Sequence, residues 1–410
     1  MERTKSIFTS ASLLLPKAVD LAAWAVIACD QFTSQPEYWQ RARELTGGGP
    51  SALELILPEA ELGVDDEARI AQIHRRMEEM LAAGLFREIP DSFIYVERTL
   101  HNGAVRRGLV GAVDLEAYDY ADASRAAVRA TEKTVTERIP PRMRVRRGAM
   151  LELSHVLLLC DDPEQELLGP CAAAKDALPT LYDLELMLGG GRLQGRLVSG
   201  EAAEAVRRRL AAYEARRLAS GETTLYAVGD GNHSLASAKA CWEELKATLP
   251  AGERLSHPAR YAMVELENLQ DEQQAFAPIH RLVTGTDPDA LLEALAARCA
   301  AEGRALPWLS GEAAGELRMP LAEGETAVAF LQRFLDETLP ALGGKLDYIH
   351  GEAALRQLAR EPGAVGFLLP PLEKESLLRS LGTAGVLPRK SFSIGEAEEK
   401  RYYLEARRIL

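Results

Sequence analysis

Several features are scarce in this sequence of 410 residues. Its five cysteines are an odd number, and no two of them form a Cys-x-x-Cys pair. The sequence therefore gives no indication of a disulfide framework or of a zinc site. Nowhere do about 18 consecutive apolar residues occur, so we expect no transmembrane helix.

Basic residues are also fewer than acidic residues. The sequence has 48 Lys and Arg against 61 Asp and Glu, a net charge of −13 at pH 7. Such a charge repels phosphate backbones and anionic membranes, so we expect neither nucleic acid nor a membrane as a partner. Basic and then apolar residues at the N-terminus resemble a targeting signal, but Pro16, Lys17 and Asp20 interrupt them. We interpret this stretch as mature protein and, with the cysteine usage, expect a cytoplasmic location.

Helical and strand patterns alternate along the chain. Apolar residues recur at helical spacing over 66–84 and 201–219. Residues 92–100 and the strand-like run after Asn102-Gly103 predict a hairpin, and 153–162 predicts a short buried strand. Three glycines at 189–191 favour another hairpin turn over a phosphate loop, because no Lys-Ser/Thr follows them. We expect an α+β fold with mixed sheets.

One stretch, LYAVGDGNHSLASAKACWEEL at 225–245, predicts a buried strand, a tight turn and a helix. A helix start presents free backbone N–H groups and binds anions. Gly229 and Gly231 would let the backbone approach a ligand, and His233 could donate to an oxyanion or shuttle a proton. Asn232 or Ser234 could cap the helix.

Asp230 is unusual beside such an anion site. An acid there is repulsive unless it holds a divalent cation or accepts a proton. In the alternative interpretation, Asp230 and Asn232 only form an Asx turn and cap the helix.

Six short segments in this order resemble the motifs of the family filed as domain of unknown function 1015 (DUF1015). The segments are IACDQFTSQPEYW (27–39), LELILPE (53–59), RATEKTVTERIPPR (129–142), VGDGNHSLASA (228–238), FAPIHRLV (276–283) and GVLPRKSFS (385–393). Some members of this family are understood as ATP-dependent kinases of free L-serine. The strand, turn and helix resemble those of ParB/sulfiredoxin-like nucleotide-binding proteins.

The resemblance implies one site for ATP, Mg²⁺ and a small hydroxy-amino acid, and it implies a role for each matching residue. The catalytic candidates are Asp30, Glu132, Asp230 and His233, with Asp230 also the metal ligand; the phosphate-binding candidates are Gly229, Gly231, Asn232, Ser234, Arg138 and Arg142; the substrate-binding candidates are His280, Arg281, Lys390 and Ser391.

Each candidate also has a simpler interpretation. Asp30, a general base or a contact for the substrate ammonium, could merely cap a loop. Glu132, a base or metal ligand, could be a helical charge partner. His280 and Arg281 could end a surface strand. We expect His155, within an apolar run, to be a buried core residue with its own partners.

The motifs extend from 30 to 391, which favours one composite domain over residues 1–410. Within it we distinguish an N-terminal part (1–150), a central ParB-like part (151–284) and a C-terminal part (285–410). The oligomeric state is left open.

The sequence departs from the family motifs at three positions. One His and the Arg of D-G-H-H-R are Asn232 and Ser234, and the His of H-E-x-T is Thr131. Loss of the Arg removes a bidentate phosphate partner, which Arg138, Arg142 or Arg281 could replace. Three hypotheses follow: a phosphotransferase acting on L-serine or a similar compound, a non-catalytic nucleotide-binding or phospho-ligand-binding regulator, and a metal-dependent phosphohydrolase.

Overall fold

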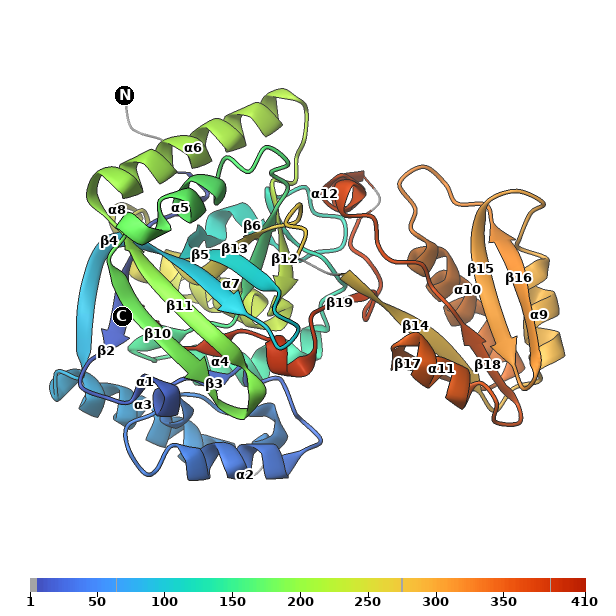
Figure 1. The fold of residues 1–410 in the computed structure, drawn as a ribbon, viewed down its shortest axis with the longest axis horizontal. Coiled ribbons are helices and arrows are strands. Elements are labelled where there is room, and N and C mark those ends of the chain that lie inside the picture. Colours follow the sequence, from blue (N-terminus) through green and yellow to red (C-terminus); the bar gives the residue numbers. More distant parts are fainter. Residues whose placement is uncertain (1–5, 64, 274–275, 384) are drawn as a thin grey trace. The chain divides into compact units, whose positions relative to one another are not determined.

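The computed structural model describes residues 6–63, 65–273, 276–383 and 385–410 (Figure 1). Its contacts divide the chain into two compact units. The first unit comprises 1–130, 134–274 and 396–410, and the second comprises 131–133 and 275–395. The segments of both units mix strands and helices, so the predicted α+β class is confirmed. A single composite domain stays a prediction.

The first unit is built on one large mixed sheet, in the order β6-β7-β12-β9-β13-β5-β4-β2-β21-β8. Strands β1, β10 and β11 pair outside this path. The strand bounds are β1 Phe8–Thr9, β2 Ala11–Pro16, β4 Phe86–Thr99, β5 Val105–Asp114, β6 Tyr118–Asp119, β7 Val128–Ala130, β8 Leu151–Leu153, β9 Leu157–Cys160, β10 Thr180–Leu186, β11 Gly191–Val198, β12 Tyr226–Asp230, β13 Tyr261–Asn268 and β21 Ala406–Arg408.

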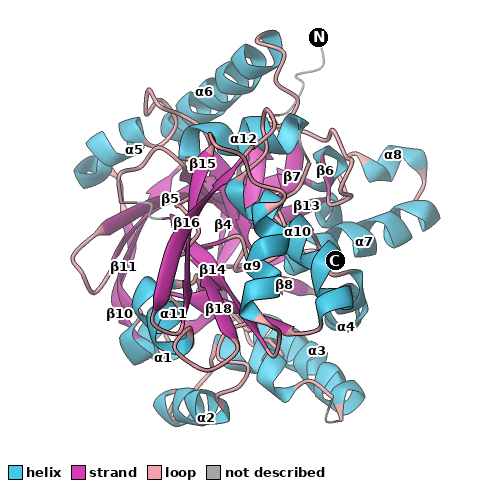
Figure 2. Cartoon of the chain, turned by 90° about the vertical axis from the view of Figure 1, so that its right-hand side faces the viewer, coloured by secondary structure: helices cyan, strands magenta, loops and turns pink. Residues whose placement is uncertain are grey.

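Both faces of this sheet are buried. On β4, Phe93 and Tyr95 enter one hydrophobic cluster, and the alternating Ile94 and Val96 enter another, as the period of two requires. Helices α6 (Gly200–Ala219) and α7 (Asn232–Thr248) cover the Phe93 side. Helices α1 (Leu21–Trp24), α2 (Pro36–Leu45) and α3 (Asp66–Ala82) cover the other. Figures 1 and 2 show α6 at one end of this unit and α2 and α3 at the other.

The predicted local elements are confirmed. Helices α3 and α6 occupy the two stretches with helical spacing. Strands β4 and β5 form the expected antiparallel hairpin, and β10 and β11 turn over the three glycines. Gly191 has φ 76°, and a Cβ there would lie 2.2 Å from the Thr99 carbonyl oxygen. These glycines therefore serve a turn. The expected strand at 153–162 is shorter, β9, and follows β8 after a break that contains His155.

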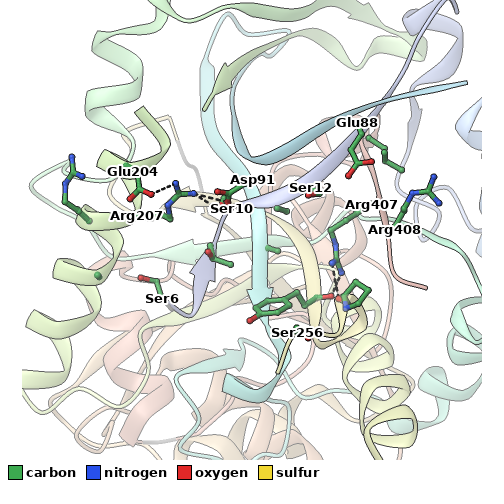
Figure 3. A pocket seen from close by; sticks show the side chains of 18 residues that line it. Ser6, Ser10, Ser12, Glu88, Asp91, Glu204, Arg207, Ser256, Arg407 and Arg408 are labelled. Atoms are coloured by element: carbon green, nitrogen blue, oxygen red, sulfur yellow. Dashed lines mark hydrogen bonds and ion pairs between the residues drawn. The ribbon is translucent and has the colours of Figure 1, made fainter. Parts of the chain in front are cut away.

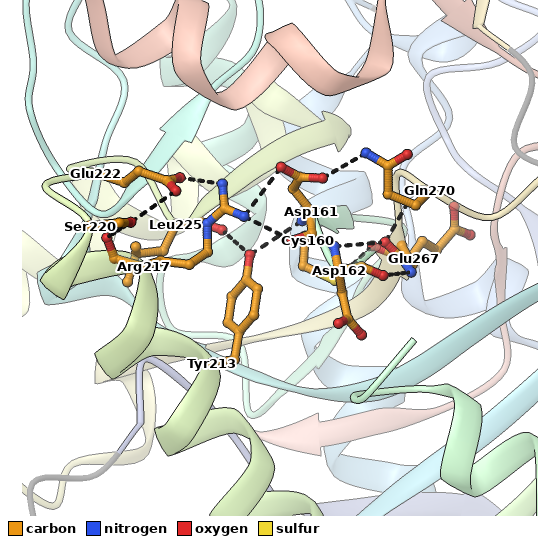
Figure 4. A network of polar contacts seen from close by, with 11 residues as sticks. Cys160, Asp161, Asp162, Tyr213, Arg217, Ser220, Glu222, Leu225, Glu267 and Gln270 are labelled. Atoms are coloured by element: carbon orange, nitrogen blue, oxygen red, sulfur yellow. Dashed lines mark hydrogen bonds and ion pairs between the residues drawn. The ribbon is translucent and has the colours of Figure 1, made fainter. Parts of the chain in front are cut away.

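A polar network at the end of β9 fixes α6 against the sheet (Figure 4). The Arg217 guanidinium donates to the backbone carbonyl of Asp161 at 2.9 Å and pairs with the Asp161 and Glu222 carboxylates. The Tyr213 hydroxyl donates to the Leu225 carbonyl at 3.0 Å. Because Leu225 directly precedes β12, the network also holds the strand that leads into the Gly-Asp-Gly turn.

The C-terminal segment is part of the first unit. Strand β20 (Tyr402–Tyr403) pairs with β3 (Val26–Ile27), and β21 pairs with β2 and β8. This pairing places residues 400–405 beside the segment that follows β3, an arrangement that the sequence patterns did not predict.

The second unit has its own sheet, in the order β16-β15-β18-β14-β17, with β19 also on β14. Helices α9 and α10 pack on one face around Phe334 and Leu335, and α11 packs around Leu355 in a separate cluster. The bounds are β14 Phe276–Thr284, α9 Pro288–Ala296, β15 Arg304–Ser310, β16 Ala313–Met319, α10 Ala327–Leu342, β17 Lys345–His350, α11 Glu352–Leu358, β18 Ala364–Phe367, α12 Lys374–Thr383 and β19 Phe392–Ile394.

Among the described residues, none of the helices has both the length and the apolar character needed to cross a bilayer.

Candidate functional site

The predicted strand, turn and helix are confirmed as β12, Gly231 and α7. Gly231 is the N-cap residue and has φ 78°, a left-handed conformation that glycine adopts without strain. A Cβ at this position would lie 3.0 Å from Val156 Cγ2 and 3.3 Å from His155 Cδ2. The turn therefore needs glycine both for its backbone angle and for its close approach to the segment before β9.

The start of α7 has no side-chain cap. The expectation that Asn232 or Ser234 caps the helix is wrong: Asn232 is the first helical residue, one position too late to cap, and Ser234 lies within the first turn. The first N–H groups of a helix have no partner within the helix. The backbone of 232–234 therefore presents donors, together with the positive end of the helix dipole, at one point.

Asp230 lies at the end of β12 and has two partners. Its Oδ1 accepts the N–H of Gly231 at 2.9 Å, and its Oδ2 lies 3.3 Å from Lys400 Nζ. Both paired side chains are largely shielded from solvent. A cation from the C-terminal segment therefore stands at the helix start, where sequence reasoning had sought Arg138, Arg142 or Arg281.

Asp30 follows β3 and lies beside the same helix start. Its Oδ2 is 3.5 Å from His155 Nε2, and the same nitrogen is 3.3 Å from the Ser234 hydroxyl. The other ring nitrogen, Nδ1, is 2.6 Å from the Tyr403 hydroxyl, which accepts the N–H of Cys29 at 3.2 Å. His155 is therefore buried and partnered, as expected, but it also contacts the candidate site.

These contacts favour one tautomer of His155. The Tyr403 hydroxyl already accepts one N–H, so donating its own proton to Nδ1 satisfies both groups. Nε2 then carries a proton that faces Asp30 and Ser234. Burial raises the pKa of Asp30, but its interactions with His155, Gln31 and Arg142 lower it, and the net direction is down. Asp30 is therefore a carboxylate that stays ionised.

His233 faces the loop after β7. Its Nε2 accepts the N–H of Val135 at 3.2 Å, which leaves the proton of the neutral ring on Nδ1. Burial, followed by the positive charges of Arg142 and Arg138, lowers the pKa of His233 to about 4. At neutral pH this side chain is an uncharged donor.

The lowered pKa of His233 predicts a pH-dependent stability. Between about pH 4 and 6.5 the unfolded chain binds the proton that the folded chain does not, so stability falls as the pH decreases through this window. We expect a loss of about 1 to 2 kcal/mol, reduced from the full value because the side chain is partly exposed. Urea unfolding at pH 7.5 and 4.5 measures it. His233→Gln, which keeps an acceptor for Val135 but does not titrate, should lose less; an equal loss in both proteins would contradict the assignment.

The two predicted phosphate-binding arginines differ in their contacts. Arg142, on α4 (Ile139–Arg146), pairs with Glu59 and donates to the Arg138 carbonyl at 2.7 Å. Glu59 belongs to the LELILPE segment, and its N–H donates to the Cys29 carbonyl. Arg138 is exposed, and in the described part of the chain its guanidinium has no partner. Among the described residues, the Arg138 guanidinium is therefore available to a ligand, whereas the charge of Arg142 is balanced by Glu59.

The described residues hold no group of three or more His, Cys, Asp or Glu side chains arranged to bind a metal ion. The Asn232 side-chain oxygen is buried and lacks a hydrogen-bond partner, and it belongs to the residue next to Gly231. Mg²⁺ is usually held by one or two carboxylates plus substrate phosphates and water. Asp230 and Asn232 thus offer one carboxylate and one unpaired amide oxygen, which are ligand types that Mg²⁺ accepts.

The other predicted residues lie in the second unit, and all of them except His280 contact one another there. Glu132 accepts the N–H groups of Lys390 and Ser391 at 3.0 and 2.9 Å, and Arg281 donates to the Lys390 carbonyl at 2.9 Å. His280 Nδ1 accepts the N–H of Leu369 at 3.2 Å. Burial lowers the pKa of His280; the Glu352 charge opposes this shift, and the charges of Arg281 and His350 add to it. The predicted residues thus form two clusters, one in each unit, and a single cleft lined by both stays a prediction.

One cavity of the first unit involves none of the predicted residues. It measures about 760 Å³ and lies between β1, β2, α6 and β21 (Figure 3). Arg207 on its wall pairs with Asp91 and Glu204, and Arg407 pairs with Glu152. Both of these arginines are thus already paired with carboxylates or backbone groups of the first unit.

Sequence reasoning missed Tyr403, Lys400 and Glu59 and set His155 aside. Of these residues, Glu59 could have been found from the sequence, because it ends the family-like segment LELILPE. Lys400 and Tyr403 come from the C-terminal segment, whose pairing with β3 is not encoded in a local pattern.

Comparison with curated proteins gives no match. Among solved structures, the chain is similar to SbnI with a C-terminal truncation from Staphylococcus aureus, at 10% identity over 70% of this chain and 82% of that one, with a TM-score of 0.37. It is similar to a conserved hypothetical protein from Pyrococcus furiosus, at 13% identity over 72% and 90%, with a TM-score of 0.34. A free serine kinase mutant in complex with ADP shares 12% identity over 72% and 87%, with a TM-score of 0.36.

The family comparison covers most of the sequence. The model described as "Protein of unknown function (DUF1015)" matches residues 13–349. This match includes the Asp30 segment, the turn around Gly231 and the His280-Arg281 pair. The chain therefore belongs to the DUF1015 family.

Proposed function

We propose that the protein is an ATP-dependent phosphotransferase that acts on free L-serine or a similar small hydroxy-amino acid. The observation that carries the proposal is the uncapped start of α7, with Gly231 in a left-handed conformation and Lys400 and Asp230 beside it. Phosphoryl transfer depends mainly on positioning and charge neutralisation, which this arrangement offers.

The nucleotide phosphates would bind the backbone N–H groups of 232–234. Lys400 and the exposed Arg138 would add positive charge to this first-unit site, in place of the family Arg that is Ser234 here. Asp230 and Asn232 would hold Mg²⁺, which neutralises charge on the phosphates when it is bound. His233, neutral at pH 7, would donate through Nδ1 to a phosphoryl oxygen.

Asp30 would bind the acceptor. Its lowered pKa makes it a weak proton acceptor, so contact with the substrate ammonium is favoured over general-base catalysis. Tyr403 and His155 would position this carboxylate, through the chain of contacts from the Cys29 N–H to Asp30.

A phosphotransfer assay tests the proposal. The full chain is incubated with Mg²⁺, [γ-³²P]ATP and a panel of L-serine, L-threonine, L-homoserine and glycerol, and labelled products are separated. We expect a labelled phospho-amino acid and an Asp30→Asn variant with a raised KM for the amino acid. Release of inorganic phosphate alone, independent of any acceptor, would instead identify a phosphohydrolase.

A non-catalytic nucleotide-binding regulator is the second candidate. It is favoured by the pairing of Asp230 with Lys400, which neutralises the proposed metal ligand, and by Ser234 in place of the family Arg. ATP binding measured by calorimetry, without product from any acceptor in the panel, would identify this function.

A further inference from the structure

Lys400 is the C-cap residue of a short 3₁₀ helix, η8 (Ala397–Glu399). Its ammonium lies 3.3 Å from Asp230 Oδ2, at the start of α7, and its side chain is only 12% exposed. A helix of three residues is too short to be stable alone, so contacts from outside must hold it. The direction of the Lys400 side chain therefore depends on whatever fixes the backbone around η8.

Arg98, a buried residue on β4, supplies these contacts. Its Nη2 donates to the carbonyl of Glu398 at 2.7 Å, and its Nη1 donates to the carbonyls of Glu399 and Lys400 at 3.0 and 2.6 Å. Its Nε donates to the Gly190 carbonyl at 2.9 Å. One guanidinium thus binds three consecutive carbonyls, including those of both peptide groups that flank the Lys400 Cα.

Arg106 reinforces this contact from the neighbouring strand, β5, where it lies directly opposite Arg98. It is buried, pairs with Glu267 at 3.0 Å and donates from Nη2 to the Glu399 carbonyl at 3.0 Å. Burial, followed by the Arg106 charge, lowers the pKa of Arg98 to about 10. Two like charges opposite each other are unfavourable, and a buried guanidinium needs partners for its N–H groups. The carbonyls of 398–400 provide these partners.

The chain is also held directly after Lys400. The Arg401 carbonyl accepts the N–H of Ala28 at 3.0 Å. The Arg401 guanidinium donates to Glu265 and Glu405, each at 2.8 Å. The backbone on both sides of Lys400 is therefore fixed, which leaves its side chain little choice of direction.

We propose that Arg98, together with Arg106, is a positioning residue of the site at the start of α7: it binds the carbonyls of 398–400 and thereby directs the Lys400 ammonium toward Asp230 and an incoming phosphate. Arg98 and Lys400 lie outside the six segments that resemble the family motifs. The inference rests on the proposed function for the phosphate, but the orientation of Lys400 by Arg98 can be measured without it.

Lysine acetylation tests the orientation in the absence of any nucleotide. The full-length wild type and Arg98→Lys are treated briefly with acetic anhydride, and the rate at each lysine is followed by mass spectrometry. Lysine lacks the planar set of five donors and cannot hold three carbonyls in one geometry. We expect Lys400 to be acetylated about threefold faster or more in the variant, because its segment opens locally.

Lys239 on α7 is the control lysine for this experiment. Its side chain is 16% exposed, and its ammonium donates to the Leu115 carbonyl at 2.9 Å, so it is shielded and paired in the same unit. Its acetylation rate should be the same in both proteins. An unchanged rate at Lys400 would overturn the proposal. A parallel increase at Lys239 would also overturn it, because Arg98 would then stabilise the unit as a whole.

A double-mutant cycle tests whether Arg98 acts on the nucleotide through Lys400. ATP affinity is measured by calorimetry for Arg98→Lys, for Lys400→Gln and for the double variant. We expect each single substitution to weaken ATP binding about tenfold and the double variant to bind no more weakly than Lys400→Gln, because the two residues act as one unit. Losses that multiply to about 100-fold would show independent effects and contradict the positioning role. If the wild type binds no ATP, the proposed function fails, while the acetylation rates still decide whether Arg98 orients Lys400.

Arg106→Lys serves if melting shows that Arg98→Lys does not fold. This variant keeps a positive charge for Glu267 but lacks the guanidinium plane that reaches the Glu399 carbonyl. We expect faster acetylation of Lys400, by a smaller factor than in Arg98→Lys, and an unchanged rate at Lys239. An unchanged rate at Lys400 in the folded variant would overturn the proposal.

Discussion

Gly231→Ala is expected to weaken ATP binding at least 100-fold and to destabilise the protein by about 1 to 3 kcal/mol. The added Cβ would require alanine at φ 78° and would lie 3.0 Å from Val156 Cγ2 and 3.1 Å from its Cα. Either the turn or the segment before β9 must shift, and the N–H groups of 232–234 shift with it. Calorimetric ATP titration and urea unfolding measure the two effects.

Gly221→Ala is the matched control for this substitution. Gly221 also has a positive φ, 85°, but a Cβ there meets nothing within 4 Å. The control should show the cost of backbone strain, about 1 kcal/mol, with unchanged ATP affinity. Wild-type affinity in Gly231→Ala would contradict a phosphate site at this turn.

Asp230→Asn is expected to lower turnover by about 100-fold or more, since metal charge stabilisation is worth several kcal/mol. The asparagine oxygen can still accept the Gly231 N–H, as Oδ1 does at 2.9 Å, so the turn should keep its shape. The negative charge that faces Lys400 and would hold Mg²⁺ is lost. Product formation and melting temperature are compared on the same samples.

The interpretation of Asp230 as a purely structural residue predicts the opposite result. Asn would then support full activity, and only Asp230→Ala would lose about 1 kcal/mol of stability. Asp287→Asn is a suitable control, because Asp287 caps α9 in the second unit and is not a candidate site residue. Full activity in Asp230→Asn would exclude the metal-ligand role.

The local parts of the site were predictable because their signals are local. A buried run, two glycines around an acid and a helical stripe define β12, the turn and α7 without reference to any distant residue. The hairpins on 92–114 and 180–198 are similar cases. Each depends on a period of two and on turn residues with a defined conformation.

The contacts that complete the site were not predictable in this way. Lys400 reaches Asp230, and Tyr403 reaches His155, because β20 pairs with β3. A strand of two residues carries too few side chains to specify a partner. The apolar run around His155 predicts a core residue, and the side chain is indeed buried. Burial does not prevent it from contacting Asp30. Its Nε2 faces Asp30 and Ser234, a direction that no spacing along the chain encodes.

The motif residues of the second unit show a different limit. Glu132 and Arg281 are charged residues in family motifs, and such residues are easily interpreted as ligand contacts. Their partners are the backbone groups of Lys390 and Ser391, more than 100 residues away along the chain. A motif identifies which residues matter, but only the fold distinguishes a residue that binds a ligand from one that positions a neighbour.

The proposed function depends above all on the binding of nucleotide phosphates at the start of α7. The most direct measurement is a crystal structure of the full chain with Mg²⁺ and a non-hydrolysable ATP analogue. We expect a phosphate oxygen within about 3.2 Å of a backbone nitrogen of residues 232–234. A nucleotide bound elsewhere, with Asp230 still paired to Lys400 and no anion at this turn, would contradict the claim.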